Sequence, residues 1–312
     1  MATPPLYLIT GGCGFIGSHL VEALLARGLR VRVLDNLSSG HRKNLALVES
    51  QLDLRIGDIG DAAALRSACE GVAGVFHLAA LVSVADSVER PMDNHQINAT
   101  GTLNVLLAAR EAGVKRVMLA STAAIYGNDP ALPKTEDMTP SPESPYAAAK
   151  LMGEHYLRIF HRLYGMETVA LRFFNVYGPR QDPRSPYSGV ISRFVDALQN
   201  EKTPVVFGDG KQSRDFVFVA DVVQGCLGAM FVEQPGDGSV YNIATSKPTD
   251  LLQLLATLGK LANRAMEPEF RETRAGDVRH SLASIEAARA ALRYEPKYDL
   301  AAGLQRLLEE SR

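Results

Sequence analysis

The sequence predicts an α/β fold, in which a doubly wound parallel sheet is joined to a smaller α/β C-terminal lobe. Apolar segments of strand length alternate with segments of helical periodicity from Leu6 to about Arg172, and this alternation is typical of a parallel sheet with helices on both faces. A glycine-rich turn follows the first apolar segment. Beyond Arg172 the alternation weakens, and proline, glycine and serine are dense from Gly178 to Gly189, so we expect a second lobe there.

The first strand and the glycines after it predict a binding site for a dinucleotide. Leu6–Ile9 has the apolar character of a buried strand, and Gly11, Gly14 and Gly17 then stand three residues apart before a helical pattern that continues from Ser18. Glycines let the backbone approach a pyrophosphate, and a helix N-terminus offers it free N–H groups and a partial positive charge. The spacing differs from the commoner G-x-G-x-x-G, so the glycines alone also fit a tight turn in an unrelated sheet protein.

The second and third strands each end beside a carboxylate. The second, at 30–34, ends at Asp35, where an acidic side chain can bond a ribose 2′-hydroxyl and repels a 2′-phosphate, so we expect NAD rather than NADP. The third, at 52–56, is followed by Asp58. That carboxylate either accepts a hydrogen bond from the adenine amino group or caps the helix expected from Asp61, and the sequence leaves both alternatives open.

The later elements complete the predicted sheet and begin the lobe. Further strands are expected at 74–78, 116–120 and 168–172, with helices at 98–112 and 146–164. Residues 1–172 are therefore predicted to form a Rossmann-type cofactor domain, and residues 173–312 mainly a substrate lobe over the carboxyl ends of the strands. In the second part we expect a helix at 190–199, strands at 204–207 and 216–219, and a helix at 221–231, within a segment of about 214–233 that packs back on the sheet.

Two hydroxyl residues follow the fifth strand, and a tyrosine and a lysine open the next helix. Tyr146 and Lys150 lie four residues apart, so they share one helix face. A nearby ammonium, like the positive ring of oxidised nicotinamide, lowers a phenol pKa from about 10, so we expect Tyr146 to act as a base near neutral pH. Ser121 and Thr122 lie over the expected nicotinamide, where a hydroxyl can bond the substrate oxygen. Tyr-x-x-x-Lys also occurs on many surface helices, and its place after the fifth strand is what favours catalysis.

The bulk composition excludes several classes of protein. The 312 residues include 33 basic and 35 acidic side chains that are well mixed, with a net charge of −2, so neither a nucleic acid nor a membrane is an expected partner. No apolar stretch is long enough to cross a bilayer. The three cysteines, Cys13, Cys69 and Cys226, are far apart and have no metal-ligand spacing. We expect a reduced cytoplasmic enzyme without a metal, since no signal-peptide pattern precedes the first strand.

Taken together, these motifs resemble the extended short-chain dehydrogenase/reductase superfamily and, within it, the UDP-sugar 4-epimerases. The resemblance covers nearly the whole chain, and its later motifs are the specific ones because they belong to a nucleotide-sugar lobe. It is carried by Thr10–Gly17, Asp35–Gly40, His77–Ala80, Asn98, Ser121–Gly127, Tyr146 with Lys150, Arg172–Pro179, Phe207–Gly210, Arg214–Phe216 and Arg274–Ser281.

The resemblance implies roles for individual residues. In catalysis Tyr146 removes the proton from the sugar 4-hydroxyl, Lys150 tunes it and bonds the nicotinamide ribose, and Thr122, where the family more often has serine, bonds the same oxygen. The implied NAD-binding residues are Gly11, Gly14, Phe15, Ile16, Asp35, Asn36, Ser38, Gly40, Asp58, Ile59, Leu78, Ala79, Ala80, Asn98, Ser121, Tyr146, Lys150 and Phe174.

The implied substrate site includes Thr122 and Tyr146 together with residues of the lobe. In it, Ser83 and Asn175 approach the sugar or its phosphates, Phe207 lies against uracil, Arg214 and Arg274 neutralise the diphosphate, Asp277 bonds a ribose hydroxyl, and Ser281 lies beside the substituent on sugar C2. A small residue at that last position leaves room for an N-acetyl group.

The implied activity is NAD-dependent 4-epimerisation of a UDP-hexose through a transient 4-keto sugar. UDP-glucose and UDP-galactose are expected substrates, and UDP-GlcNAc and UDP-GalNAc are further candidates. A UDP-uronic acid is an alternative, with Arg180 or Arg184 near the sugar. Sugar-nucleotide 4,6-dehydratases and UDP-glucuronate decarboxylases are disfavoured because Ala123 and Ala124 after Thr122 cannot transfer protons. A non-catalytic NAD-binding protein is a last alternative. The family commonly dimerises through the helices after Asn98 and at Tyr146, so a homodimer is expected.

Overall fold

A computed structural model describes residues 3–181, 189–233, 236–273 and 278–310 of the chain. Its largest layer is a seven-stranded sheet in which every neighbouring pair is parallel. The order across the sheet is β10 (Asp237–Ile243), β6 (Glu167–Phe173), β5 (Arg116–Thr122), β4 (Val72–His77), β1 (Leu6–Thr10), β2 (Arg30–Asp35) and β3 (Asp53–Ile56). The direction of strand order reverses between β1 and β4, which is where open α/β sheets bind ligands.

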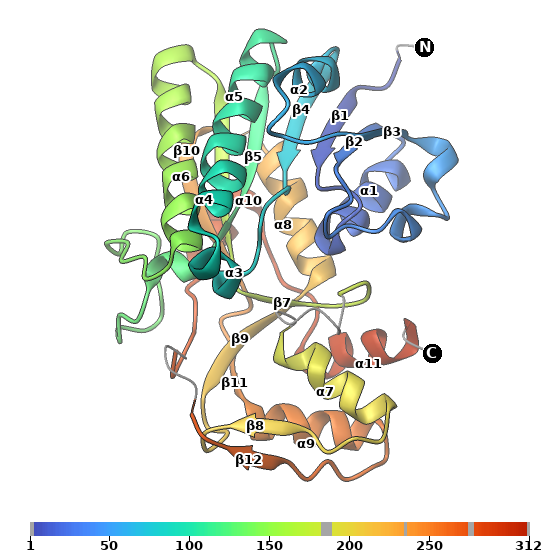
Figure 1. Ribbon diagram of the computed structural model, residues 1–312, viewed down its shortest axis with the longest axis vertical. Coiled ribbons are helices and arrows are strands. Elements are labelled where there is room, and N and C mark those ends of the chain that lie inside the picture. Colours follow the sequence, from blue (N-terminus) through green and yellow to red (C-terminus); the bar gives the residue numbers. More distant parts are fainter. Residues whose placement is uncertain (1–2, 182–188, 234–235, 274–277, 311–312) are drawn as a thin grey trace.

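Helices cover both faces of this sheet, as predicted (Figure 1). On one face, α1 (Phe15–Ala26), α8 (Val219–Phe231) and α10 (Glu286–Leu292) bury their apolar sides in a single cluster with the strands. On the other face, α2 (Ala62–Cys69), α5 (Gly101–Glu111) and α6 (Pro145–Tyr164) do the same. Parallel strands are buried on both sides in this arrangement, which explains why they read as continuous apolar runs.

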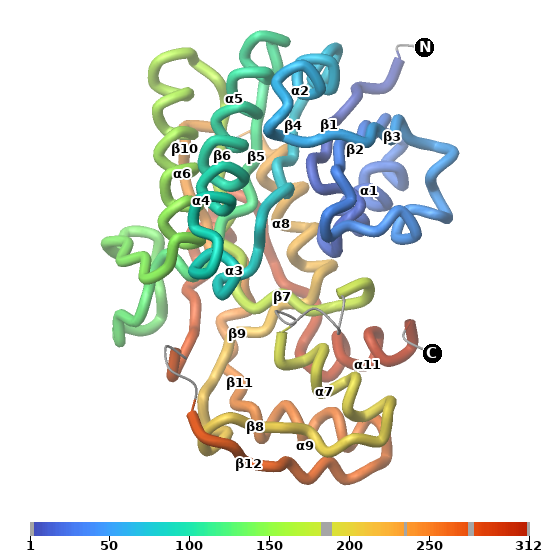
Figure 2. Tube along the Cα trace, viewed as in Figure 1, coloured from blue at the N-terminus to red at the C-terminus, as the bar shows by residue number. Residues whose placement is uncertain are grey.

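Two short helices and an irregular helical turn join β4 to α5. They are α3 (Val84–Glu89), α4 (Pro91–Asn94) and a π-helical segment at His95–Thr100, and they lie beside the N-terminal half of α6 (Figure 2). The helix that the sequence placed at 98–112 therefore begins as a π-helix, a form that is often found at functional sites.

The lobe has its own core, built around two small sheets. One has the order β11 (Pro248–Asp250), β9 (Ser213–Phe218) and β7 (Asn175–Tyr177), and the other pairs β12 (Glu269–Arg271) with β8 (Val205–Phe207). The helices α7 (Val190–Gln199), α9 (Leu251–Leu261) and α11 (Leu300–Glu310) pack on these strands in a third apolar cluster. The lobe lies below the carboxyl ends of the large sheet in Figure 1.

Strand β10 is the main element that sequence periodicity missed. It starts with the polar residues Asp237, Gly238 and Ser239, Gly238 has φ +83°, and the pairing with β6 shifts register between Asp237 and Ser239. A glycine and a bulge interrupt the alternation by which strands are recognised. The chain thus returns from the lobe to complete the sheet.

Candidate active site

The loop after β1 is the first part of the site, and its geometry requires glycine. Gly11 has φ +74°, and a Cβ at this residue would lie 2.7 Å from the backbone nitrogen of Ala79. A Cβ on Gly17 would lie 2.2 Å from the carbonyl oxygen of Gly11. Gly14 is the N-cap of α1 and provides no side-chain cap, so the first N–H groups of α1, on Phe15 and Ile16, are of the kind that binds anions at a helix N-terminus. This cradle fits the pyrophosphate of a dinucleotide.

Asp35, at the carboxyl end of β2, is buried and firmly held. Its carboxylate accepts hydrogen bonds from the backbone N–H groups of Cys13 (2.9 Å) and Leu37 (2.8 Å). A carboxylate has about four acceptor positions, so it retains capacity for two ribose hydroxyls. Gly40 makes room beside it, since a Cβ at Gly40 would lie 3.0 Å from the Asp35 carboxylate. The position and fixed orientation of this group fit the predicted preference for NAD.

The helix-capping alternative for Asp58 is wrong. Asp61 caps α2, because its side chain accepts hydrogen bonds from the N–H groups of Ala63 and Ala64. Asp58 instead accepts from Gly60 N and from the Asn36 side-chain amide, each at 2.6 Å. This leaves the adenine contact of Asp58 as a prediction, together with the roles of Asn36 and of Ser38, whose N–H bonds the Asn36 side chain.

The segment after β4 lies against the glycine loop, and buried polar side chains fix it there. The N–H groups of Leu78 and Ala79 bond the carbonyl and hydroxyl oxygens of Thr10, and the Thr10 hydroxyl also bonds His77 (2.8 Å). Burial, followed by the charge of Lys150, lowers the pKa of His77 to about 3. Its ring is therefore neutral at physiological pH and holds the segment in place through hydrogen bonds. Ala80 continues this segment.

Asn98 holds the next stretch of the same segment rather than presenting a free amide. Its side chain accepts from Leu81 N (3.0 Å) and donates to Leu81 O (2.9 Å) and to Asn94 (2.7 Å). It lies on the π-helical segment and is buried, as is Ile59. The predicted contact of Asn98 with the cofactor stays a prediction, and its visible function is to anchor the loop that leads to Ser83.

The three predicted catalytic residues converge from β5 and α6. Thr122 is the last residue of β5, and its hydroxyl accepts from Ala124 N (3.1 Å). Tyr146 and Lys150 share a face of α6, which begins at Pro145 and is capped by Ser144. Burial raises the pKa of the Tyr146 phenol to about 12, and a hydrogen bond with Thr122 offsets only part of this rise. Thr122 and Tyr146 therefore form the hydroxyl pair that the sequence predicted.

Because burial dominates the pKa of the Tyr146 phenol in this structure, the tuning of that pKa by Lys150 stays a prediction. Its ammonium group donates to the carbonyl oxygen of Ala120 (2.9 Å), and burial lowers its own pKa to about 8. The phenol stays protonated at neutral pH unless another positive charge comes close. The oxidised nicotinamide ring of NAD is such a charge.

Ser121 was expected to face the cofactor, but its proton is directed elsewhere. The hydroxyl donates to Glu154 on α6 (2.6 Å), and the same carboxylate is bound by Arg172 on β6. Ser121 can still accept a hydrogen bond. Sequence reasoning missed Glu154, although a carboxylate four residues after Lys150 on a helix face that packs against the sheet was a usable signal.

The predicted substrate residues come from several elements of the chain. Ser83 caps α3 by accepting from Asp86 N (2.8 Å) and is buried, whereas Asn175 begins β7 and is exposed. Phe174, a predicted cofactor residue that precedes Asn175, is buried, with its ring 6.3 Å from that of Tyr126. Of these, only Asn175 offers an exposed side chain.

In the lobe, β9 brings two other predicted residues together. Ser281 N donates to Ser213 O (3.0 Å), and Arg214 bonds the same carbonyl oxygen (2.9 Å). Phe207 ends β8 and precedes a turn whose Asp209 is clasped by Arg279 through two 2.7 Å bonds, a contact that the sequence did not predict. Arg274, Asp277 and Arg184 lie outside the described residues.

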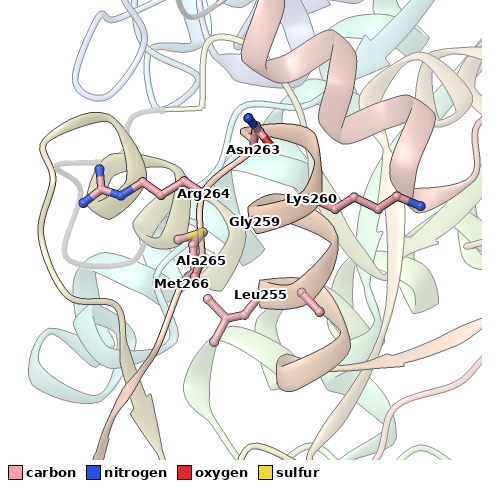
Figure 3. A pocket seen from close by; sticks show the side chains of 8 residues that line it. Leu255, Gly259, Lys260, Asn263, Arg264, Ala265 and Met266 are labelled. Carbon is pink, nitrogen blue, oxygen red and sulfur yellow. The ribbon is translucent and has the colours of Figure 1, made fainter.

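A surface cavity of about 410 Å³ lies away from this site, at the C-terminal end of α9. Figure 3 shows the side chains of Arg264 and Lys260 pointing to opposite sides of it. None of the predicted catalytic, cofactor or substrate residues lines this cavity, so it is separate from the candidate active site. In the described part of the chain no cluster of three or more His, Cys, Asp or Glu side chains suits a metal ion, and no helix has both the length and the apolar character that a bilayer span requires.

Comparison with known proteins identifies the family. The model of the "NAD dependent epimerase/dehydratase family" matches residues 7–244. The chain belongs to this family. It is 40% identical over 306 residues to a UDP-glucose 4-epimerase of Mycolicibacterium smegmatis, with 97% of each chain covered. It is 34% identical over 318 residues to a UDP-glucuronate 4-epimerase of Thermodesulfobacterium geofontis, with 98% of this chain and 96% of that one covered.

A solved structure agrees with this assignment over the whole fold. The UDP-N-acetylglucosamine 4-epimerase from Methanobrevibacter ruminantium M1, in complex with UDP-N-acetylmuramic acid, superimposes with a TM-score of 0.94, 36% identity and 99% coverage of both chains. These findings confirm the predicted family, the α/β Rossmann-type fold and the class of enzyme, an NAD-dependent UDP-sugar 4-epimerase. The three relatives differ in the sugar that they are named for.

Proposed function

We propose that this protein interconverts UDP-glucose and UDP-galactose and also accepts the N-acetylated pair. The observation that carries the proposal is the hydroxyl pair of Thr122 and Tyr146 at the carboxyl end of β5, which Ala123 and Ala124 follow in the chain. A dehydratase needs a further acid and base next to this pair, and alanine supplies neither. A protein that only binds a dinucleotide has no need of such a pair.

Some of the predicted residues bind the cofactor or the substrate, and others transfer the proton. The glycine loop would hold the pyrophosphate of NAD, and Asp35 would hold the adenine ribose. Bound NAD would supply the hydride acceptor and donor for sugar C4. The Tyr146 phenol takes the proton of the 4-hydroxyl and gives it back, and Thr122 orients that oxygen. Lys150, whose ammonium is already buried against Ala120 O, bonds the nicotinamide ribose. Arg214 and Arg274 bind the diphosphate, as charged forks do.

The preference for a neutral hexose is supported by the state of Arg180. A cation would stabilise the carboxylate of a uronic acid, and of the two candidate arginines only Arg180 lies within the described residues. Its guanidinium is instead paired with Glu22 on α1 at 2.6 Å. A small residue at position 281 supports the N-acetylated substrates, because Ser281 leaves space that an aromatic ring would fill.

The test is incubation with UDP-glucose, UDP-galactose, UDP-GlcNAc and UDP-glucuronate, with the products separated by chromatography. We expect turnover of the first three, and Ser281→Tyr should remove turnover of UDP-GlcNAc alone. Equal loss on the acetylated and plain sugars would reject the role of Ser281. Turnover of UDP-glucuronate alone would overturn the proposed substrate.

We also propose a homodimer that pairs α5 and α6 with the same helices of a second copy. Met152, Ile159 and Leu163 lie on α6 with 39%, 45% and 65% of their surface exposed, and exposed apolar side chains that gather on one helix support an interaction surface there. The two helices lie side by side at the outer edge of the molecule (Figure 1). Sedimentation should show a dimer, and Ile159→Asp should produce monomers. A wild-type monomer at micromolar concentration would refute this assembly.

Residues 1–172 are assigned mainly to cofactor binding and residues 173–312 mainly to the UDP-sugar lobe, although β10 and α8 return to the large sheet. All three cysteines are free and buried, which supports a reducing, cytoplasmic location.

A further inference from the structure

A single buried carboxylate connects α6 to the two strands that carry the catalytic end of the sheet. Glu154 accepts from Ser121 Oγ (2.6 Å) and Arg172 Nε (3.0 Å) on one oxygen, and from Arg172 Nη2 (2.8 Å) on the other. Ser121 on β5 and Arg172 on β6 are register partners. The side chains of Glu154 and Arg172 are each only 1% exposed. The carboxylate therefore fixes one turn of α6 to both strands at once.

This contact is the last of three that follow successive residues of β5. A Cβ on Gly153 would lie 2.9 Å from Leu119, so the helix backbone is drawn close to the strand there. Lys150 donates to Ala120 O, and Glu154 then accepts from Ser121. The next residue of β5 is Thr122, which bonds Tyr146 of the same helix. The placement of the reacting hydroxyls thus depends on how α6 is seated on β5.

Arg172 fixes the orientation of the Glu154 carboxylate between α6 and β5. Burial lowers the pKa of Arg172, but the hydrogen bonds and charge of Glu154 more than offset this and raise it overall. The guanidinium carbon lies 4.8 Å from the centre of the Tyr126 ring, and the Tyr126 hydroxyl donates to Asn242 on β10 (2.7 Å). A buried ion pair of this kind is often no more stabilising than apolar packing. Charge-assisted hydrogen bonds do fix geometry more narrowly than apolar contacts.

We propose that Glu154 is a positioning residue for epimerisation, which holds Ser121 with the help of Arg172 and so sets the approach of Thr122 to Tyr146. This inference rests on the proposed function, because it assigns Glu154 to the same reaction. The Glu154 side chain is buried, and we assign it no contact with substrate or cofactor. A shift of about 1 Å between reacting groups can cost on the order of 100-fold in rate, so a residue that sets this spacing acts on kcat rather than on substrate binding.

The test compares Glu154→Gln and Ser121→Ala with a matched control, Glu167→Gln. Glu167 binds Arg116 at 2.6 Å, and this pair bridges the same two strands at their opposite ends. We expect kcat to fall about 10- to 100-fold in both test variants, with KM for UDP-glucose and bound NAD within threefold of the wild type. The double variant should lose no more than the worse single variant, because both changes break one contact. The control should lower the Tm and leave kcat within twofold.

Each outcome decides the matter. A kcat within twofold of wild type in Ser121→Ala, which leaves the ion pair intact and tests the same contact if Glu154→Gln does not fold, overturns the proposal. The proposal is also overturned if the losses of kcat multiply in the double variant. It is overturned as well if kcat falls by more than twofold in Glu167→Gln when its Tm falls. A wild-type protein that epimerises no UDP-sugar overturns the proposed function instead, and the two failures are therefore distinguishable.

Discussion

Replacing Lys150 by methionine should stabilise the protein while it abolishes epimerisation. The Lys150 side chain is buried, and burial lowers the pKa of its ammonium group from 10.5 to about 8. A difference of one pKa unit corresponds to about 1.4 kcal/mol, so burial of the charge costs roughly 3 kcal/mol of folding stability at neutral pH. The variant also loses the hydrogen bond to Ala120 O, which lowers its folding stability by about 1 kcal/mol. The expected net gain at pH 7 is therefore about 2 kcal/mol.

The sign of the pH dependence makes this prediction specific. Below pH 8 the amine is protonated in both the folded and the unfolded state, so the folded state carries the whole penalty. Between pH 8 and 10.5 the folded state releases its proton first, so the penalty declines, and above 10.5 it is absent. The advantage of Lys150→Met over the wild type should therefore be largest below pH 8 and fade as the pH rises towards 10.5.

Urea unfolding of the full chain, freed of bound nucleotide, measures this difference at pH 7, 8, 9 and 10. Lys43→Met is the control, because Lys43 is exposed and its replacement should change stability by less than about 0.5 kcal/mol at every pH. A variant less stable than wild type at pH 7, or a gain in stability that does not vary with pH, would show that burial of the Lys150 charge does not lower folding stability.

Three further predictions concern the site directly. Tyr146→Phe should lower epimerisation about 10²- to 10⁴-fold while absorbance shows that NAD is still bound, and wild-type turnover would refute its role as a base. Gly17→Ala should lose most of the bound NAD, because the new Cβ would lie 2.2 Å from Gly11 O; an unchanged Kd for NAD would contradict the close packing of that loop. Asp35→Ala should bring the Kd values for NAD and NADP together in a fluorescence titration, and a preserved preference would mean that another group selects the cofactor.

The sequence was informative where chemistry depends on short-range order. Gly11, Gly17 and Asp35 are recognisable because a strand, a tight turn and a helix start follow each other directly. Tyr146 and Lys150 are recognisable because helix spacing places them on one face. Their surroundings were not: neither the acceptor of the Lys150 ammonium nor the partner of Ser121 follows from spacing, since both depend on how closely α6 packs on β5.

The lobe was harder to predict for a related reason. The strands β7, β8, β11 and β12 are three residues long, too short to show an alternation of apolar and polar residues. Their pairing joins segments far apart in the chain, as when β12 lies beside β8 or β11 beside β9. Only the family resemblance indicated which of these segments carry substrate residues.

The late return of the chain to the large sheet has a consequence for folding. Until residues 237–243 emerge during synthesis, β6 is an edge strand with unpaired backbone N–H and C=O groups, and such edges recruit strands from other molecules. A fragment that ends near residue 172 should therefore self-associate. The amino-terminal cofactor domain therefore depends for its solubility on a strand that lies more than sixty residues later in the chain.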